Sequence, residues 1–145
     1  MTPDDLQQSL MHFIRSFGLH QPEQTPCGQA LTVSEAHALS TLATTSQLSQ
    51  QDLAEQLGLE KSSVSRLLTK LEQRGWVKRH DSQHDGRSKV LQLSETGKGM
   101  VSQLQAARRK KFDAIFTQIP ASERDAVEAS LKTLIQACDQ AAKEP

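Results

Sequence analysis

Residues 49–76 read SQQDLAEQLGLEKSSVSRLLTKLEQRGW, and this stretch predicts two short helices joined by a tight turn. Ser49 followed by Asp52 is typical of a capping-box-like helix start, because the hydroxyl and the carboxylate can each satisfy a free backbone N–H. Gly58 tolerates the left-handed conformation that closes a helix. A second helix is expected to follow and to end at Gly75. Two short helices with a glycine-containing turn predict a helix-turn-helix.

The second helix, expected from about Glu60, has two chemically different faces. Its apolar residues recur at i, i+3, i+4 and i+7, so they share one side of the helix; they are Val64, Leu67, Leu68 and Leu71. The opposite face has hydroxyls, two cations and no carboxylate: Ser62, Ser63, Ser65, Arg66, Thr69 and Lys70. Small donors and acceptors without negative charge suit a helix that enters a DNA major groove. An ordinary solvated helix face is the alternative interpretation.

A β-hairpin is predicted after these helices. Residues 76–80 and 89–93 alternate apolar with polar side chains, as half-buried strands do, and turn-forming residues separate them. A hairpin behind a recognition helix is a wing, and Arg87 is long enough to reach a narrow minor groove. Asp85 can hold that guanidinium, or the two can form an exposed pair of little consequence. The expected wing contacts are His84, Asp85, Arg87 and Lys89, and the expected contacts to the DNA backbone are Gln50, Gln51 and Lys61.

The charged residues are unevenly distributed, although the formal net charge is zero. Residues 1–59 hold one cation against six acids, whereas residues 60–90 hold eight cations against four acids. The second segment therefore has a surplus of four positive charges, and it is the segment with the predicted DNA-reading geometry. Attraction to phosphate acts over a Debye length of about 8 to 10 Å, so this local surplus favours DNA and predicts a salt-dependent affinity.

These residues resemble the MarR family (multiple antibiotic resistance regulators) of winged-helix transcription factors. Residues 49–57 are similar to its "LTQ..LA..L" helix, and residues 61–76 to its recognition helix ending in "L..RGW". Residues 81–97 are similar to its wing signature "D..RD.R…LT..G", which stands here as Asp81, His84, Asp85, Arg87, Leu93, Ser94 and Gly97. His84 replaces an arginine that the family commonly has. The resemblance implies a dimer whose terminal helices interdigitate.

The expected fold is mostly α with a small β-hairpin. We predict a winged helix-turn-helix DNA-binding lobe at residues 32–94 and a helical dimerisation lobe formed by residues 1–31 and 95–145. An amphipathic helix is expected to end at Gly18, and a loop with two prolines follows it. A capping box that starts at Thr32 then predicts the next helix.

Two further helices are expected after the hairpin. Ser94 caps a long helix that Pro120 ends, and the last helix runs from Ala121 to about Ala142 with a heptad-like seam: Val127, Leu131, Leu134, Cys138 and Ala141. Palindromic half-sites need a two-fold protein, so we predict a homodimer. A monomeric core built on the four phenylalanines is the alternative. We interpret the basic run at 108–111 as a solvated helix face rather than a second DNA site.

The predicted function is a DNA-binding transcriptional regulator, a repressor that a small ligand or an oxidant releases. One hypothesis places an aromatic or phenolic ligand in a crevice, although the same residues can simply pack: Phe13, Phe17, Leu39 and Phe112. A second makes Cys27 a thiol sensor, because a nearby protonated His20 or His37 would lower its pKa; an incidental cysteine is the alternative. A third is a metal-responsive repressor with zinc held by a set of acceptable ligand types: His20, Cys27, Glu35 and His37. No other cofactor is expected.

Other classes of function fit the sequence less well. The five histidines are scattered, and no nucleophile, base and orienting acid can be assembled from them, so we do not expect an enzyme. The two cysteines are 111 residues apart and give no disulfide framework. No run approaches the roughly 20 apolar residues of a membrane span and no leader is seen, so no membrane partner and a cytoplasmic location are expected. A winged helix that binds a protein through the Trp76 hairpin is the remaining alternative, and the acid-free face at 62–70 argues against it.

Overall fold

The computed structural model describes residues 1–82 and 89–143. The predicted wing contacts His84, Asp85 and Arg87 lie outside these residues. The chain divides into two compact units, Met1–Arg108 and the segment from Arg109 onward. Helix α5, Glu95–Gln118, contributes residues to both units. No helix of the described residues is both long and apolar enough to cross a membrane.

The first unit begins with helix α1, Pro3–Phe17, which a complete capping box starts and Gly18 ends in the left-handed conformation (φ 95°). No residue of α1 is buried, and Phe13 is 49% exposed. The predicted amphipathic helix is therefore confirmed, while its apolar stripe is left largely open in this chain. The loop that follows is held by the buried Thr25, which accepts a hydrogen bond from the Gln29 N–H through its hydroxyl.

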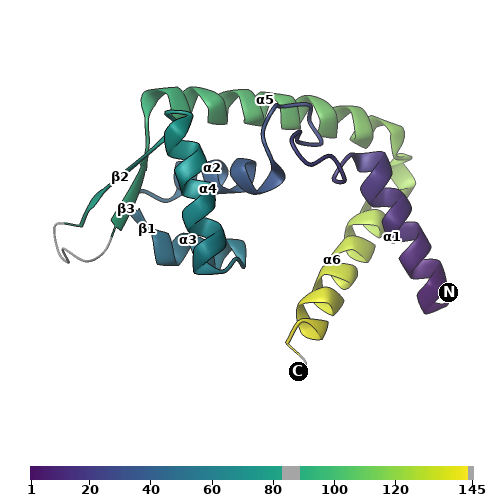
Figure 1. Ribbon diagram of the computed structural model, residues 1–145. Helices are drawn as coiled ribbons and strands as arrows, with labels where there is room; N and C mark the ends of the chain where they lie inside the picture. The colour runs from purple at the N-terminus through teal and green to yellow at the C-terminus, as the bar shows by residue number, and fades with distance from the viewer. Residues whose placement is uncertain (83–88, 144–145) are drawn as a thin grey trace. The chain divides into compact units, whose positions relative to one another are not determined.

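Three short helices and a small sheet surround the core of this unit (Figure 1). The helices are α2, Val33–Thr44, α3, Gln50–Leu57, and α4, Lys61–Gln73. The capping box that starts at Thr32 is confirmed, and the Ser49 hydroxyl accepts from the Asp52 N–H at 3.0 Å. The side chains that predicted the amphipathic face of α4 are all buried: Val64, Leu67, Leu68 and Leu71. The predicted helix-turn-helix is thus present, with its apolar faces turned to one core.

The sheet has three antiparallel strands rather than the two of the expected hairpin. β2, Val77–Asp81, pairs with β3, Lys89–Leu93, and β3 also pairs with β1, Leu48–Ser49, so that the order is β1-β3-β2. The hairpin begins one residue later than predicted. The third strand was missed because two residues are too few to show a period-two pattern.

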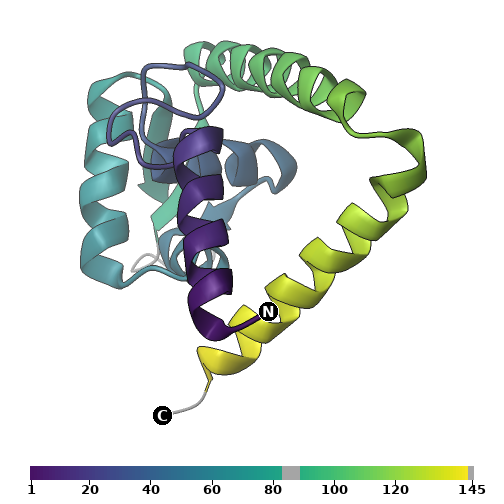
Figure 2. The ribbon, with the colours of Figure 1, turned by 90° about the vertical axis from the view of Figure 1, so that its right-hand side faces the viewer.

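Helix α5 starts against the base of the hairpin. The Ser94 hydroxyl accepts from the Gly97 N–H at 3.0 Å and donates to the Gly75 carbonyl, which confirms Ser94 as the cap. Gly97 lies so close to the hairpin that a Cβ built on it would stand 2.1 Å from the Trp76 carbonyl oxygen. Only glycine therefore allows this approach of helix to strand. Figure 2 shows the same elements after a quarter turn.

The second unit contains the end of α5, a 3-10 turn at Ala121–Glu123 and helix α6, Arg124–Ala141. The turn is the part of the predicted last helix that is not α-helical. The Arg124 guanidinium lies 4.0 Å from the Phe116 ring centroid and donates to the Ile119 carbonyl at 3.2 Å, so it joins the two helices of the unit. α6 has no buried residue, and its large apolar side chains are open to solvent: Val127, Leu131 and Ile135.

Candidate nucleic-acid interface

Helix α4 presents the predicted polar face to solvent. Arg66, Thr69 and Lys70 are exposed, and the three serines of this face are at least partly accessible: Ser62, Ser63 and Ser65. No residue from 61 to 71 is acidic. Because the opposite face is buried in the core, residues 61–71 of the helix can meet a partner only with their hydroxyls and cations. This is the donor-rich and carboxylate-free surface that base edges and phosphates require.

The three residues predicted to contact a DNA backbone lie at helix starts. Gln50 and Gln51 are the first residues of α3, and Lys61 is the first residue of α4. Gln51 and Lys61 are exposed, whereas Gln50 is half-buried and its amide oxygen accepts a hydrogen bond from Arg79 at 3.2 Å. Two of the three side chains are therefore open to a partner, and the third is partly engaged within the chain.

Ion pairs within the chain neutralise part of the local positive surplus. Arg79 pairs with Glu72 across β2 and α4, and Lys89 pairs with Asp81 across the hairpin. The hydrogen bond and the charge of Lys89 lower the pKa of Asp81 below its ordinary value. Four cations of residues 60–90 have no acidic ion-pair partner in the part of the chain that the structure describes: Lys61, Arg66, Lys70 and Lys78. Most of these free cations thus lie on α4, while Lys89 closes the base of the wing.

The end of α4 is attached to the loop after α1. The Arg74 guanidinium donates to the Ala30 carbonyl at 3.0 Å, lies 3.7 Å from the Glu35 carboxylate and stands 4.8 Å from the Trp76 ring centroid. Glu35 is only 2% exposed and also accepts from the Thr32 N–H at 3.0 Å. These contacts fix the helix at its C-terminal end, and they cover part of the Trp76 ring that the protein-binding alternative needs.

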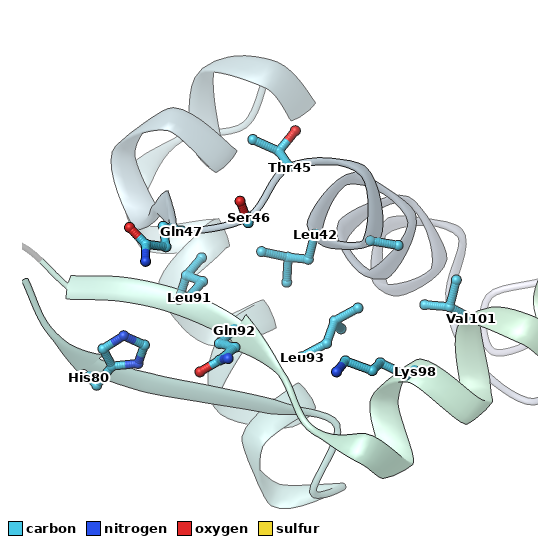
Figure 3. A pocket seen from close by; sticks show the side chains of 11 residues that line it. Leu42, Thr45, Ser46, Gln47, His80, Leu91, Gln92, Leu93, Lys98 and Val101 are labelled. Atoms are coloured by element: carbon cyan, nitrogen blue, oxygen red, sulfur yellow. The ribbon is translucent and has the colours of Figure 1, made fainter.

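A cavity of about 450 Å³ lies beside the hairpin (Figure 3). Its walls come from the end of α2, the loop before β1, the strands β2 and β3 and the first turns of α5. Apolar and polar side chains both line it: Leu42, Ala43, Thr45, Ser46, Gln47, His80, Leu91, Gln92, Leu93, Lys98 and Val101. Gln47 in its wall has a left-handed backbone, with φ 56°. None of the residues predicted for an effector crevice lines this cavity.

Those predicted effector residues have different surroundings. Phe13 and Phe17 stack on each other with ring centroids 5.4 Å apart. Leu39 is fully buried in the core of the first unit, so its side chain is closed to solvent in this structure. Phe112 belongs to the second unit and is 53% exposed. The crevice stays a prediction.

The residues predicted for a thiol or metal switch do not form a metal site. Within the described ranges, no three His, Cys, Asp or Glu side chains come together in a way that could hold a metal ion. The Glu35 carboxylate is used by Thr32 and Arg74 instead. Desolvation, and then the charge of Arg108, lower the pKa of His37, which disfavours the imidazolium that the thiol hypothesis needs. Cys27 is half-buried and His20 is exposed.

Comparison with known proteins identifies the architecture. A family model described as the MarR family matches residues 31–89, which span α2 to the start of β3. Residues 31–89 are a MarR-family domain. It is 35% identical over 97 residues to the HTH-type transcriptional regulator YfiV of Bacillus subtilis, a match that covers 67% of this chain and 61% of YfiV. The MarR resemblance expected from the helix-turn-helix and wing motifs is thus confirmed.

Two further comparisons, one of sequence and one of structure, add to this match. The transcriptional repressor MprA of Escherichia coli K12 is 28% identical over 84 residues, which are 58% of this chain and 48% of MprA. The chain therefore spans only about half to three-fifths of the curated relatives it matches first. The S. aureus MepR–DNA complex superimposes with a TM-score of 0.70 at 21% identity, over 94% of this chain and 98% of MepR. The winged-helix fold class is confirmed.

Two residues of this MarR-type surface were not anticipated from the sequence. In the sequence, Arg74 and Arg79 are two of the eight cations of residues 60–90, but in the structure each has specific partners on other elements. The alternation along 76–80 does place Arg79 on the same side as Val77, which is the face turned to the helices. That is the signal that could have shown its inward orientation.

Proposed function

We propose that this chain, with its MarR-family domain, is a transcriptional regulator that binds double-stranded DNA through α4 and the wing. The observation that carries the proposal is the exposed face of α4, which has hydroxyls and cations and no carboxylate over residues 61–71. Arg66 lies on this face and extends from a helix whose position the core fixes. Arginine makes bidentate contacts to guanine in the major groove, so Arg66 is the first candidate for reading sequence.

The proposal includes a homodimer that acts as a repressor. A dimer places two recognition helices about 34 to 36 Å apart, which matches one turn of DNA and a pseudo-palindromic operator. The open apolar side chains of α6 offer a surface for a second copy. MprA is named a repressor and MepR has been crystallised with DNA, which supports the same activity here.

Release of the DNA by a small ligand or an oxidant completes the proposal. The cavity beside the hairpin has a volume in the range of small-molecule sites and touches β2, β3 and the start of α5. A ligand there would act directly on the base of the wing. This cavity therefore supports regulation by a small ligand. A response to peroxide would instead require Cys27.

The DNA proposal is tested with a duplex from the region immediately upstream of the gene. We expect Arg66→Met to weaken binding to that duplex by about 1 to 3 kcal/mol and to change the preferred sequence, because a base contact is lost. Arg109→Met is the matched control, since Arg109 is also an exposed arginine of a helix but lies outside the proposed surface. Gel shifts with a set of single-base variants measure both effects. An equal loss for all duplexes would assign Arg66 to phosphate, and no binding by the parent would remove the function.

A further inference from the structure

Arg79 contacts three side chains on two helices. It lies on β2, where its Nε pairs with the Glu72 carboxylate of α4. Its Nη1 donates to the Gln50 Oε1 of α3 at 3.2 Å, and its Nη2 lies 3.4 Å from the Thr69 Oγ1 of α4. A guanidinium is a planar fork that can hold several acceptors at fixed angles, which an ammonium group cannot do. One side chain thus fixes the first strand of the wing to both helices of the helix-turn-helix.

These contacts decide which atoms of Gln50 and Thr69 are left for DNA. Arginine has donors and no acceptor, so the Gln50 amide must turn its oxygen toward Arg79 and its NH₂ group away from it. An NH₂ group is a donor, as contact with a phosphate oxygen requires. The only proton of the Thr69 hydroxyl is donated to the Ser65 carbonyl at 2.9 Å. Thr69 therefore has no proton left to donate to DNA, whereas Gln50 keeps a donor for a phosphate.

Arg79 is itself poorly suited to contact DNA. Its side chain is 24% exposed, and Glu72 neutralises its charge. The neighbouring Lys78 is exposed and has no ion-pair partner among the residues that the structure describes. Two adjacent cations of the same strand thus differ in the role that their surroundings allow.

We propose that Arg79 is a positioning residue for DNA binding, which orients the Gln50 amide donor toward a phosphate and holds the wing strand against α4 without touching the duplex. This rests on the proposed function. Arg79→Lys keeps the charge but cannot hold three acceptors, so it should lose most of what Arg79→Ala loses. Lys78→Ala removes one cation from the same strand without breaking any of these contacts.

The test is a fluorescence anisotropy titration of the upstream duplex at several salt concentrations, with a double-mutant cycle on Arg79→Ala and Gln50→Ala. We expect Arg79→Lys and Arg79→Ala each to weaken binding about tenfold, and the double variant to bind no more weakly than Arg79→Ala alone, because the Gln50 contact is already lost. The salt dependence of Arg79→Ala should equal that of the parent, since no phosphate contact by a cation is removed.

Two results would overturn the positioning role while leaving DNA binding intact. One is an additive loss in the double variant, and the other is a salt slope that falls by about one in Arg79→Ala, as a direct phosphate contact would give. A parent protein that binds no duplex would instead remove the proposed function together with this inference. Thermal unfolding of Arg79→Lys, which retains the charge and most of the side-chain volume, separates lost binding from lost folding.

Discussion

At the scale of single residues, His37 gives the chain a predictable response to pH. Desolvation, and then the charge of Arg108, lower the pKa of this imidazole from its ordinary value of 6.5. Arg108 is held in place by a hydrogen bond to the Ser40 hydroxyl at 2.9 Å. Because the folded-state pKa is the lower one, the unfolded chain binds more protons in the window below about pH 6.5. The contribution of His37 to stability is therefore complete above this pH and is lost as the pH falls.

We expect the free energy of unfolding to decrease as the pH is lowered from 7 through 6.5 toward the folded-state pKa. His37→Gln should flatten this part of the curve, and Arg108→Met should flatten it in part, because it removes the second cause of the shift. Urea unfolding at half-unit steps of pH measures the effect. A His37→Gln variant with the slope of the parent protein would show that the imidazole is not responsible.

At the scale of elements, the junction of α5 with the hairpin depends on one glycine. A Cβ at position 97 would stand 2.1 Å from the Trp76 carbonyl oxygen and 2.9 Å from its carbon, whereas one at position 99 would meet nothing within 4 Å. We expect Gly97→Ala to destabilise the fold by about 2 kcal/mol or more, as overpacking does. Gly99→Ala should stabilise it by about 0.5 to 1 kcal/mol, as alanine does in a helix. Chemical unfolding compares the two variants, and equal effects would contradict this account of the junction.

The elements also show how far the sequence can predict this structure. The starts of α2, α3 and α5 were predicted because a cap and its partner lie three residues apart. The partners of Arg79, Arg74 and Arg108 were not, because Gln50, Ala30 and Ser40 are 29, 44 and 68 positions away along the chain. The periodicity of the sequence therefore predicts which face of α4 is open to solvent. The contacts that hold this face in place are seen only in the structure.

At the scale of the whole molecule, the central expectation is a homodimer made through the terminal helices. Leu131 and Ile135 of α6 are 47% and 58% exposed, which is unusual for large apolar side chains one turn apart. We expect Leu131→Glu to convert the dimer to a monomer at micromolar concentration, because it would bury a charge in the interface. Lys132→Glu places the same charge on the neighbouring residue off the predicted seam and should leave the dimer intact. Light scattering after gel filtration measures the mass, and a dimeric Leu131→Glu variant would place the interface elsewhere.

Binding of one DNA site by a pair of α4 helices is tested most directly by the mass and specificity of the complex with the upstream duplex. Sedimentation velocity with labelled DNA and an unrelated competitor determines both. We expect two chains per duplex and binding that survives the competitor, with an affinity that falls steeply as salt is raised. One chain per duplex, or complete loss of the complex to the unrelated DNA, would contradict a pair of α4 helices reading one site.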